Sequence, residues 1–372
     1  MSEFSEYGTF SDEHHGSALT VTAGVEQPPT VDTVSLQRFL NRKRQLLTLD
    51  EYAEGILSGN RTVLSQAITL VESSLPEHVQ MAQDVVERCL PHSGNSIRIG
   101  VTGVPGSGKS TFIEAMGGYL AAKGHKLAVL AIDPSSERSK GSILGDKTRM
   151  EELSTAPNAF IRPSPSSGSL GGVARKTRET VFLCEAAGFD VIFIETVGVG
   201  QSETAVHYMT DFFLLLQIAG AGDELQGIKR GIMEMADLIA VNKADGGNME
   251  KAQLAQAQYR SALRLFPKPA SGWEPQAVIC SAITRLGIDA IWETVQQYVQ
   301  MTKDNGYFGL RRQQQAKYWM NETIRNSLIR HFYHHPDVVT LLPEYEQKIT
   351  DGRMNSFAAA RELLDRYFTT QY

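Results

Sequence analysis

One segment constrains the fold of this chain more than any other. Residues 103–110 read Gly-Val-Pro-Gly-Ser-Gly-Lys-Ser and fit the pattern GxxxxGK[ST]. The segment follows a short apolar run, Ile97–Val101, and precedes a helical pattern that starts near Ser110. Its glycines let the backbone curl so that several N–H groups face one anion, and the helix start adds its positive end. The sequence therefore predicts a phosphate-binding loop between a strand and a helix.

The residue types in this loop suit a nucleotide. We expect Lys109 to reach the terminal phosphates, and the Ser110 hydroxyl to be a ligand for Mg²⁺. The residues expected to surround the phosphates are Gly103, Val104, Pro105, Gly106, Ser107, Gly108, Lys109, Ser110 and Thr111. The pattern alone does not distinguish ATP from GTP.

A second motif, Asn242-Lys-Ala-Asp245, supplies that distinction. It follows the apolar run Leu238–Val241, at the carboxyl edge where α/β sheets bind ligands. The Asp245 carboxylate can accept two hydrogen bonds from guanine, whereas adenine would leave it unpaired. Ser281 and Ala282 follow the last apolar run and resemble the companion loop, whose backbone amide meets the base oxygen. The residues predicted to bind guanine are Asn242, Lys243, Asp245, Ser281 and Ala282.

Acidic residues in three places are candidates for a magnesium site, because Mg²⁺ prefers hard oxygen ligands. Asp133 ends the second apolar run, and Glu195 begins the motif Glu195-Thr-Val-Gly198. Asp146 lies between Gly145 and Met150, where a solvated loop carboxylate is the alternative interpretation. We expect these carboxylates to join Ser110 at the metal, Glu195 directly or through water. The Gly198 amide is expected to bind the γ-phosphate.

The central region alternates short apolar runs with helical patterns such as Thr111–Lys123. Nearly continuous apolar runs are typical of strands buried on both faces of a parallel sheet. This alternation predicts an α/β fold with a doubly wound, mostly parallel sheet of the P-loop NTPase type. The expected strands are Ile97–Val101, Leu127–Ile132, Val191–Ile194, Phe212–Leu216, Leu238–Val241 and Ala277–Cys280.

Helical patterns flank this core on both sides. Residues 1–30 are polar and predict a disordered tail, and residues 31–95 predict an N-terminal helical region. The P-loop domain is expected over 96–303, followed by a helical arm over 304–372. This arm could pack on the core or bind a second subunit. Pro336 and Pro343 are expected to break the chain between its helices.

Composition narrows the class of protein. The net charge of −6 argues against a nucleic-acid partner, which requires a basic face. Three widely separated cysteines fit reduced thiols. With no signal-like apolar segment and no apolar run long enough for a membrane span, we expect a cytoplasmic protein with no membrane partner.

Longer motifs carry a resemblance to a known family. The chain resembles the MeaB/ArgK family of P-loop GTPases over roughly residues 40 to 370. The stretches that carry it are Ile132–Ser136, Gly141–Met150, Arg162–Gly172 and Glu195–Glu203. The resemblance implies a Mg²⁺-dependent GTPase that binds GTP and GDP. It also implies a homodimer with a C-terminal helical arm, and a chaperone role toward an adenosylcobalamin-dependent acyl-CoA mutase, chiefly methylmalonyl-CoA mutase.

The resemblance also assigns residues to catalysis. It implies roles for Lys109 and Glu195 at the nucleotide. It also places Lys229 in a loop, Ala221–Gly231, that responds to binding of the partner mutase. There a cation would stabilise charge on the phosphate as an arginine finger does, the alternative being a solvated loop lysine. Gln201 is a candidate for orienting the attacking water.

Two other functions remain open at the level of the sequence. An older family label suggests an ATP-dependent kinase associated with lysine, arginine and ornithine transport, against which Asn242–Asp245 argues. A nickel-delivery GTPase is the other, although no Cys/His motif lies near the nucleotide motifs. The cluster His331, His334 and His335 fits an exposed or structural group better than a metal site.

Overall fold

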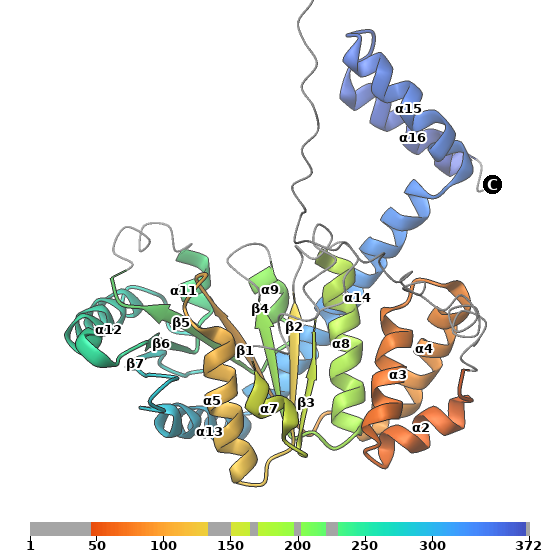
Figure 1. Ribbon diagram of the computed structural model, residues 1–372. Coiled ribbons are helices and arrows are strands. Elements are labelled where there is room, and N and C mark those ends of the chain that lie inside the picture. Colours follow the sequence, from red (N-terminus) through yellow and green to blue (C-terminus); the bar gives the residue numbers. More distant parts are fainter. Residues whose placement is uncertain (1–45, 133–149, 164–169, 197–201, 221–229, 370–372) are drawn as a thin grey trace, which may run out of the picture. The chain divides into compact units, whose positions relative to one another are not determined.

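Seven parallel strands form one sheet in a computed structural model of the chain, which describes residues 46–132, 150–163, 170–196, 202–220 and 230–369. Their order across the sheet is β3-β2-β4-β1-β5-β6-β7 (Figure 1), within the compact unit Thr48–Tyr372. The strands are β1 (Ile97–Gly103), β2 (Leu127–Ile132), β3 (Ala159–Arg162), β4 (Val191–Thr196), β5 (Phe212–Ile218), β6 (Leu238–Asn242) and β7 (Gln276–Ile279). The predicted doubly wound α/β fold is confirmed, and every strand pair in the sheet is parallel.

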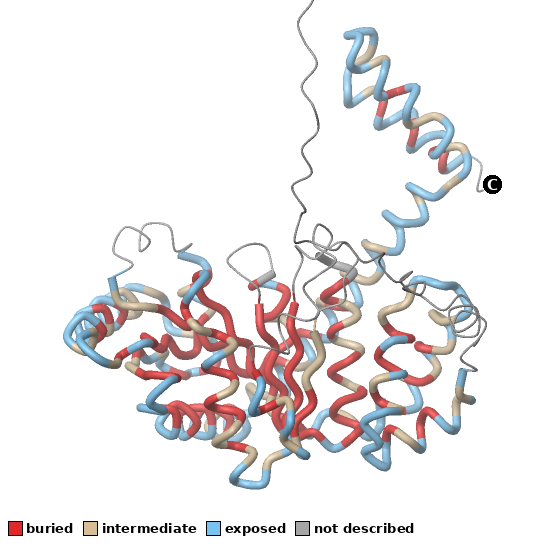
Figure 2. The backbone as a smooth tube through the Cα atoms, in the orientation of Figure 1, coloured by how far each residue is buried: buried red, intermediate tan, exposed pale blue. Residues whose placement is uncertain are grey.

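Strand β1 lies at the centre of the sheet, between β4 and β5. Val101 pairs with Glu195 of β4, and Gly103 pairs with Leu216 of β5. Buried residues concentrate in these strands (Figure 2), as continuous apolar runs require. This register brings the carboxyl ends of β1, β4 and β5 to one edge of the sheet.

Helices cover both faces of the sheet. On one face, α5 (Lys109–Ala122), α7 (Glu151–Thr155) and α13 (Ile288–Asp304) share a hydrophobic core with the strands. On the other face, α8 (Leu170–Ala186) packs on β2, and α9 (Ser202–His207) packs on β1 and β4. The remaining connections contain α11 (Arg230–Met235), the 3-10 turn η3 (Gly246–Asn248) and α12 (Met249–Leu263), which packs on β6 and β7.

Three N-terminal helices pack on one another and on α8 (Figure 1): α2 (Leu49–Leu57), α3 (Arg61–Glu72) and α4 (Pro76–Cys89), followed by the turn η1 (Leu90–His92). Thr48 caps α2 in a reciprocal capping box with Glu51, and the Asn60 side chain caps α3. Glu72, at the end of α3, pairs with Arg162 of β3, and its carbonyl accepts a hydrogen bond from Lys176 of α8. These contacts join the N-terminal helices to the edge of the sheet.

Strand β3 is missing from the strands predicted by the sequence. It has only four residues, of which Ala159 and Phe160 are buried, and Pro163 follows it directly. A run this short, next to a proline, carries too little apolar signal to be recognised. It pairs with β2 from Leu127 to Leu130 and forms one edge of the sheet.

The C-terminal helices are α14 (Tyr307–Tyr333), α15 (Pro336–Thr350) and α16 (Ser356–Thr369). The expected break at Pro336 is confirmed, since α14 ends at Tyr333 and α15 begins at Pro336, whereas the break expected at Pro343 was wrong. Pro336 occupies the first turn of α15, where a missing N–H costs nothing, and the helix continues through Pro343. Contacts of Tyr345 with Ala359 and Leu363 hold α15 against α16 and offset the lost hydrogen bond.

The base of α14 is fixed to the sheet by buried charges. The Arg312 guanidinium of α14 pairs with Asp211, just before β5, at 2.8 Å. A separate buried pair joins Arg98 of β1 to Glu185 of α8 at 2.8 Å. Burial opposes ionisation of Asp211, but the hydrogen bonds and charges of Arg312 and Arg98 hold its pKa below its ordinary value. The carboxylate therefore stays ionised and bound in the folded protein.

Replacing Arg312 with alanine is expected to lower the free energy of unfolding by about 3–5 kcal/mol, because it leaves the buried Asp211 carboxylate without its main partner. Urea unfolding followed by circular dichroism measures the change. Arg325→Ala on the same helix is the matched control, since its pair with Glu322 has an arginine side chain that is 67% exposed. Its loss should cost at most about 1 kcal/mol, and an equal effect of the two variants would contradict the prediction.

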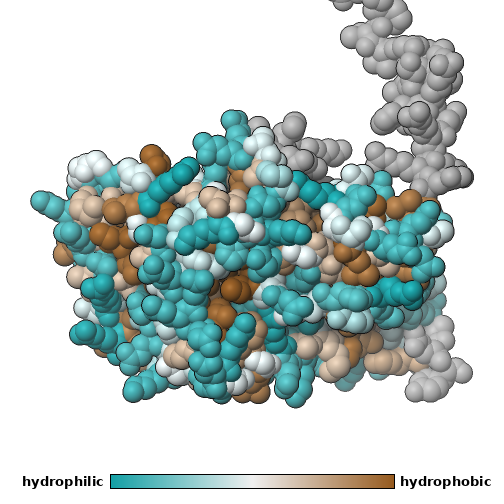
Figure 3. Space-filling model, turned by 90° about the horizontal axis from the view of Figure 1, so that it is seen from below, coloured by the Kyte–Doolittle hydropathy of each residue, from teal (hydrophilic) through white to brown (hydrophobic). Residues whose placement is uncertain are grey.

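In the part of the chain that the structure describes, no helix is long and apolar enough to cross a membrane. The surface seen in Figure 3 mixes hydrophilic side chains with small hydrophobic groups.

Candidate nucleotide-binding site

The loop between β1 and α5 has the curled backbone that its glycines predict. Gly106 and Gly108 have φ angles of 78° and 85°, in the left-handed region. A Cβ on Gly103 would stand 2.1 Å from the Leu216 carbonyl oxygen, and one on Gly108 would stand 2.9 Å from the Asn242 side-chain nitrogen. Strand β5 and the end of β6 therefore approach the loop so closely that larger residues are excluded.

Lys109 lies folded against this loop. Its Nζ donates hydrogen bonds to the carbonyl oxygens of Gly103 at 2.9 Å and Val104 at 3.4 Å. The residue is only 8% exposed, so its ammonium charge lies at the loop and is largely shielded from solvent. Gly108 precedes α5, and none of the described side chains caps this helix start. The first N–H groups of α5 can therefore point at an anion.

A hydroxyl and a carboxylate meet beside the loop. The Ser110 Oγ donates a hydrogen bond to Glu195 Oε1 at 2.9 Å, and Glu195 is 5% exposed. Thr196, the next residue of β4, donates to the Thr102 hydroxyl of β1 at 2.9 Å. Paired hard oxygens of this kind fit the ligands that Mg²⁺ takes in proteins.

Asn242 links three segments of the site. Its Nδ2 donates to the Ser107 carbonyl of the loop at 2.8 Å, and its Oδ1 accepts from the Ala282 N–H at 3.0 Å. The Cys280 thiol lies 3.6 Å from the same oxygen, and burial raises its pKa to about 12, so it stays protonated as a weak donor. These contacts use the Asn242 side chain to hold the phosphate loop against the base loop, and its role in binding the base stays a prediction.

Asp245 and Lys243 lie at the end of β6. The Ser281 hydroxyl donates to Asp245 Oδ2 and accepts from the Thr284 N–H at 3.1 Å, which orients the carboxylate. Lys243 has a left-handed φ of 60°, and its Cε lies 3.9 Å from where a Cβ on Gly108 would stand. The lysine stem thus lies beside the phosphate loop.

The structure brings most of the predicted residues to one edge of the sheet. The loop Gly103–Thr111, Glu195, Asn242–Asp245 and Ser281–Ala282 meet there through the contacts above. Five predicted residues lie outside the described part of the chain: Asp133, Asp146, Gly198, Gln201 and Lys229. No motif in the sequence indicated that Thr102 and Thr196 bond beneath the loop, because single threonines in apolar runs carry no pattern.

The histidine cluster is distant in the sequence from these motifs. A ring nitrogen of His331 lies 2.8 Å from the Tyr367 hydroxyl, and the His335 ring also packs against Tyr367. Among the residues that the structure describes, no group of three or more His, Cys, Asp and Glu side chains could hold a metal ion. These contacts join His331 of α14, and His335 just before α15, to Tyr367 of α16.

Comparisons with known proteins agree with this geometry. Residues 64–337 match the family described as methylmalonyl-CoA mutase-associated GTPase MeaB. A probable GTPase of Mycobacterium tuberculosis is 49% identical over 318 residues, covering 86% of this chain and 95% of the relative. GTPase ArgK of Escherichia coli is 45% identical, covering 87% and 98%.

Two further relatives extend the comparison. A mouse protein named methylmalonic aciduria type A homolog, mitochondrial, is 45% identical, covering 86% of this chain and 79% of the relative. A solved structure described as a LAO/AO transport system kinase is 37% identical with a TM-score of 0.70, covering 87% and 99%. The long family match and these identities, together with the phosphate and base loops, place this chain in the MeaB family of GTPases, as a guanine nucleotide-binding protein that hydrolyses GTP.

Proposed function

We propose that this GTPase gates cofactor loading of an adenosylcobalamin-dependent acyl-CoA mutase of the methylmalonyl-CoA mutase type and protects that mutase from inactivation. The family description, which names the mutase and matches residues 64–337, carries the proposal. The mouse relative, named for methylmalonic aciduria, supports it independently. GTP hydrolysis would then control when this protein acts on the mutase.

The residues of the site suggest how hydrolysis proceeds. Backbone N–H groups of the loop and of the first turn of α5 bind the phosphate oxygens, and Lys109 turns from the Gly103 carbonyl to the terminal phosphates. Ser110 and Glu195 would hold Mg²⁺ together with Asp133 and Asp146. Bound there, the metal supplies positive charge for the developing phosphate charge. The Asp245 carboxylate, oriented by Ser281, selects guanine.

Two further roles complete the proposal. The Gly198 amide binds the γ-phosphate, and Lys229 stabilises charge on it when the mutase binds, as a finger residue supplied by another segment does. Gln201 is a second candidate, as the residue that orients the water. The arm 304–372 joins two copies of the chain, and the exposed apolar side chains of Met320, Ile324 and Leu328, one turn apart on α14, support this.

Binding to a purified methylmalonyl-CoA mutase tests the proposal. Isothermal titration with the protein loaded with GTP, with GDP and without nucleotide should give saturable binding whose affinity depends on the nucleotide, because a switch needs differential affinity between its states. Serum albumin is the matched control for non-specific association. No binding to the mutase in any nucleotide state would sink the chaperone function and leave the GTPase activity untouched.

The solved LAO/AO transport system kinase favours a second candidate, a kinase that phosphorylates a transport component. Labelled ATP and labelled GTP, each incubated with the protein and a periplasmic amino-acid-binding protein, separate the two. Transfer of label to the binding protein supports the kinase. Release of all label as inorganic phosphate from GTP supports the GTPase switch.

A further inference from the structure

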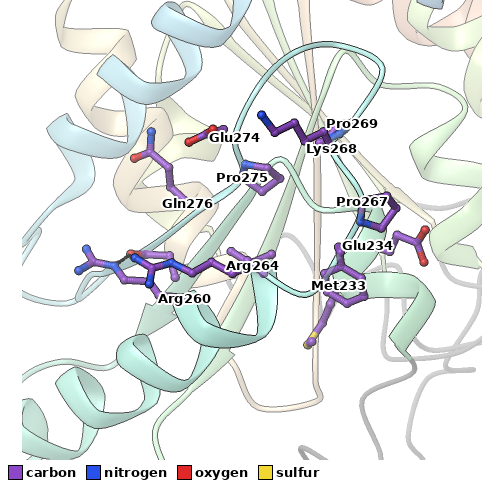
Figure 4. A pocket seen from close by; sticks show the side chains of 13 residues that line it. Met233, Glu234, Arg260, Arg264, Pro267, Lys268, Pro269, Glu274, Pro275 and Gln276 are labelled. Atoms are coloured by element: carbon purple, nitrogen blue, oxygen red, sulfur yellow. Dashed lines mark hydrogen bonds between the residues drawn. The ribbon is translucent and has the colours of Figure 1, made fainter.

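A hollow lies away from the nucleotide site, between α11, the end of α12 and the loop that leads into β7. Its volume is about 550 Å³. Figure 4 shows Arg260 and Arg264 reaching into it from the end of α12, with Met233 and Glu234 of α11 on the other side. Nothing in the nucleotide chemistry uses these residues.

The wall of the hollow carries an excess of positive charge on an acidic protein. Arg260, Arg264 and Lys268 line it against two acids, Glu234 and Glu274, while the whole chain has a net charge of −6. In the described part of the chain, none of these three cations makes an ion pair within 4.0 Å. No carboxylate of the described residues therefore neutralises their charge by an ion pair.

Part of the lining of the hollow is apolar and stiff. Phe266 and three prolines, Pro267, Pro269 and Pro275, contribute to it, and the ring of each proline fixes a backbone angle. The Arg230 guanidinium, at the start of α11, lies 5.6 Å from the centre of the Phe266 ring and holds the loop against that helix. A surface of this kind needs little reorganisation when a ligand binds.

The neighbouring edge strand is closed to strand addition at the hollow. β7 is the last strand of the sheet, and Ala277 is its second residue. The Ala277 carbonyl accepts hydrogen bonds from Gln256 Nε2 at 2.9 Å and from Arg260 Nε at 3.1 Å. Because this edge acceptor is already satisfied, recognition has to use side chains and not a continuous backbone ladder.

We propose that this hollow docks an extended acidic segment of a partner protein, with carboxylates at alternate positions and apolar side chains between them. Arg260 and Arg264 are four residues apart, a rise of about 6 Å along a helix. Alternate side chains of an extended chain repeat every 6.8 Å or so. Two alternate carboxylates can therefore meet both arginines, while the intervening side chains pack on Phe266 and the prolines.

A free small anion fits the hollow less well than a protein segment. Arg260, Arg264 and Lys268 are all exposed, so none is desolvated enough to hold a single phosphate or carboxylate tightly. Several weak charge contacts along a peptide, added to its apolar contacts, can give measurable affinity where a single charge contact with a small anion cannot. The inference rests on this surface alone and stands whether or not the partner is a mutase.

Fluorescence polarisation with labelled peptides tests the docking surface on the full chain. A peptide that alternates glutamate and leucine should bind saturably and more weakly as NaCl rises, whereas one that alternates lysine and leucine should not bind. The double variant Arg264→Glu/Lys268→Glu should bind the acidic peptide at least about 10-fold more weakly. Lys251→Glu/Lys317→Glu, two exposed positions outside the hollow, makes the same charge change and should bind as the unaltered protein does.

Three results would overturn the inference: no saturable binding of the acidic peptide, equal binding by both double variants, or displacement of the peptide by free glutamate or phosphate at similar affinity. The last result would indicate a small-anion site. Unchanged circular dichroism and GTP hydrolysis in the Arg264→Glu/Lys268→Glu variant exclude misfolding as the cause of lost binding.

Discussion

Replacing Lys109 with alanine is expected to reduce kcat for GTP hydrolysis by at least about 100-fold. The Lys109 ammonium is buried at the phosphate loop, where it bonds the Gly103 and Val104 carbonyls, and it has only to turn from them to reach the terminal phosphates. In the Lys109→Ala variant, the negative charge that develops on the terminal phosphate has no cation from α5 to stabilise it. Release of inorganic phosphate from GTP under saturating nucleotide measures the loss.

Lys123→Ala is the matched control for this prediction. Lys123 is the residue that ends the same helix, it is exposed, and its ammonium lies over the Tyr119 ring. Its removal should leave kcat within about 2-fold, as expected of a surface change far from the phosphates. If Lys109→Ala retained hydrolysis while circular dichroism showed a folded protein, the phosphate loop would not be the catalytic site.

Replacing Asp245 with asparagine is expected to weaken GTP binding by at least about 100-fold and to create binding of xanthosine triphosphate. The carboxylate accepts from the guanine N1–H and amine, and an asparagine amide cannot accept both. Xanthine has a carbonyl where guanine has the amine, and that oxygen can accept from the new side-chain amide. Competition of each nucleotide against a fluorescent GTP analogue measures both changes.

Ser281→Ala gives the control for Asp245. The Ser281 hydroxyl orients the Asp245 carboxylate but would not contact the base, so its removal should cost about 1 kcal/mol of GTP binding, near 5-fold. It should not produce binding of xanthosine triphosphate. A wild-type protein that bound ATP as well as GTP would show that Asp245 does not select the base.

The parts of the fold that the sequence predicts well are those with a local cause. The phosphate loop lies between β1 and α5 because its glycines, its lysine and the flanking apolar runs are all within a few residues. The continuous apolar runs gave six of the seven strands for the same reason. Strand β3 was missed because four residues beside Pro163 carry no period, and pairing with β2 supplies what the local pattern lacks.

The features that were not predicted from the sequence depend on contacts between segments that are distant along the chain. Asn242 meets Ser107 and Ala282 across separations of 135 and 40 residues, and no spacing rule indicates that its side chain holds the loops together. Pro343 was expected to break the chain between two helices, but tertiary packing of α15 on α16 outweighs the local penalty. The basic hollow near β7 was not predicted either, because it forms only where α11, with Met233 and Glu234, meets the segment that carries Arg260, Arg264 and Lys268.

The rate of GTP hydrolysis, measured against increasing concentrations of an adenosylcobalamin-dependent methylmalonyl-CoA mutase, tests the proposed function most directly. We expect a slow rate for the protein alone and a saturable rise of at least about 10-fold, as partner-completed GTPase sites show. Lys109→Ala should abolish this rise. A rate that stays constant at every mutase concentration, with GTP still hydrolysed, would contradict the proposal that the nucleotide on this loop times the action of a mutase.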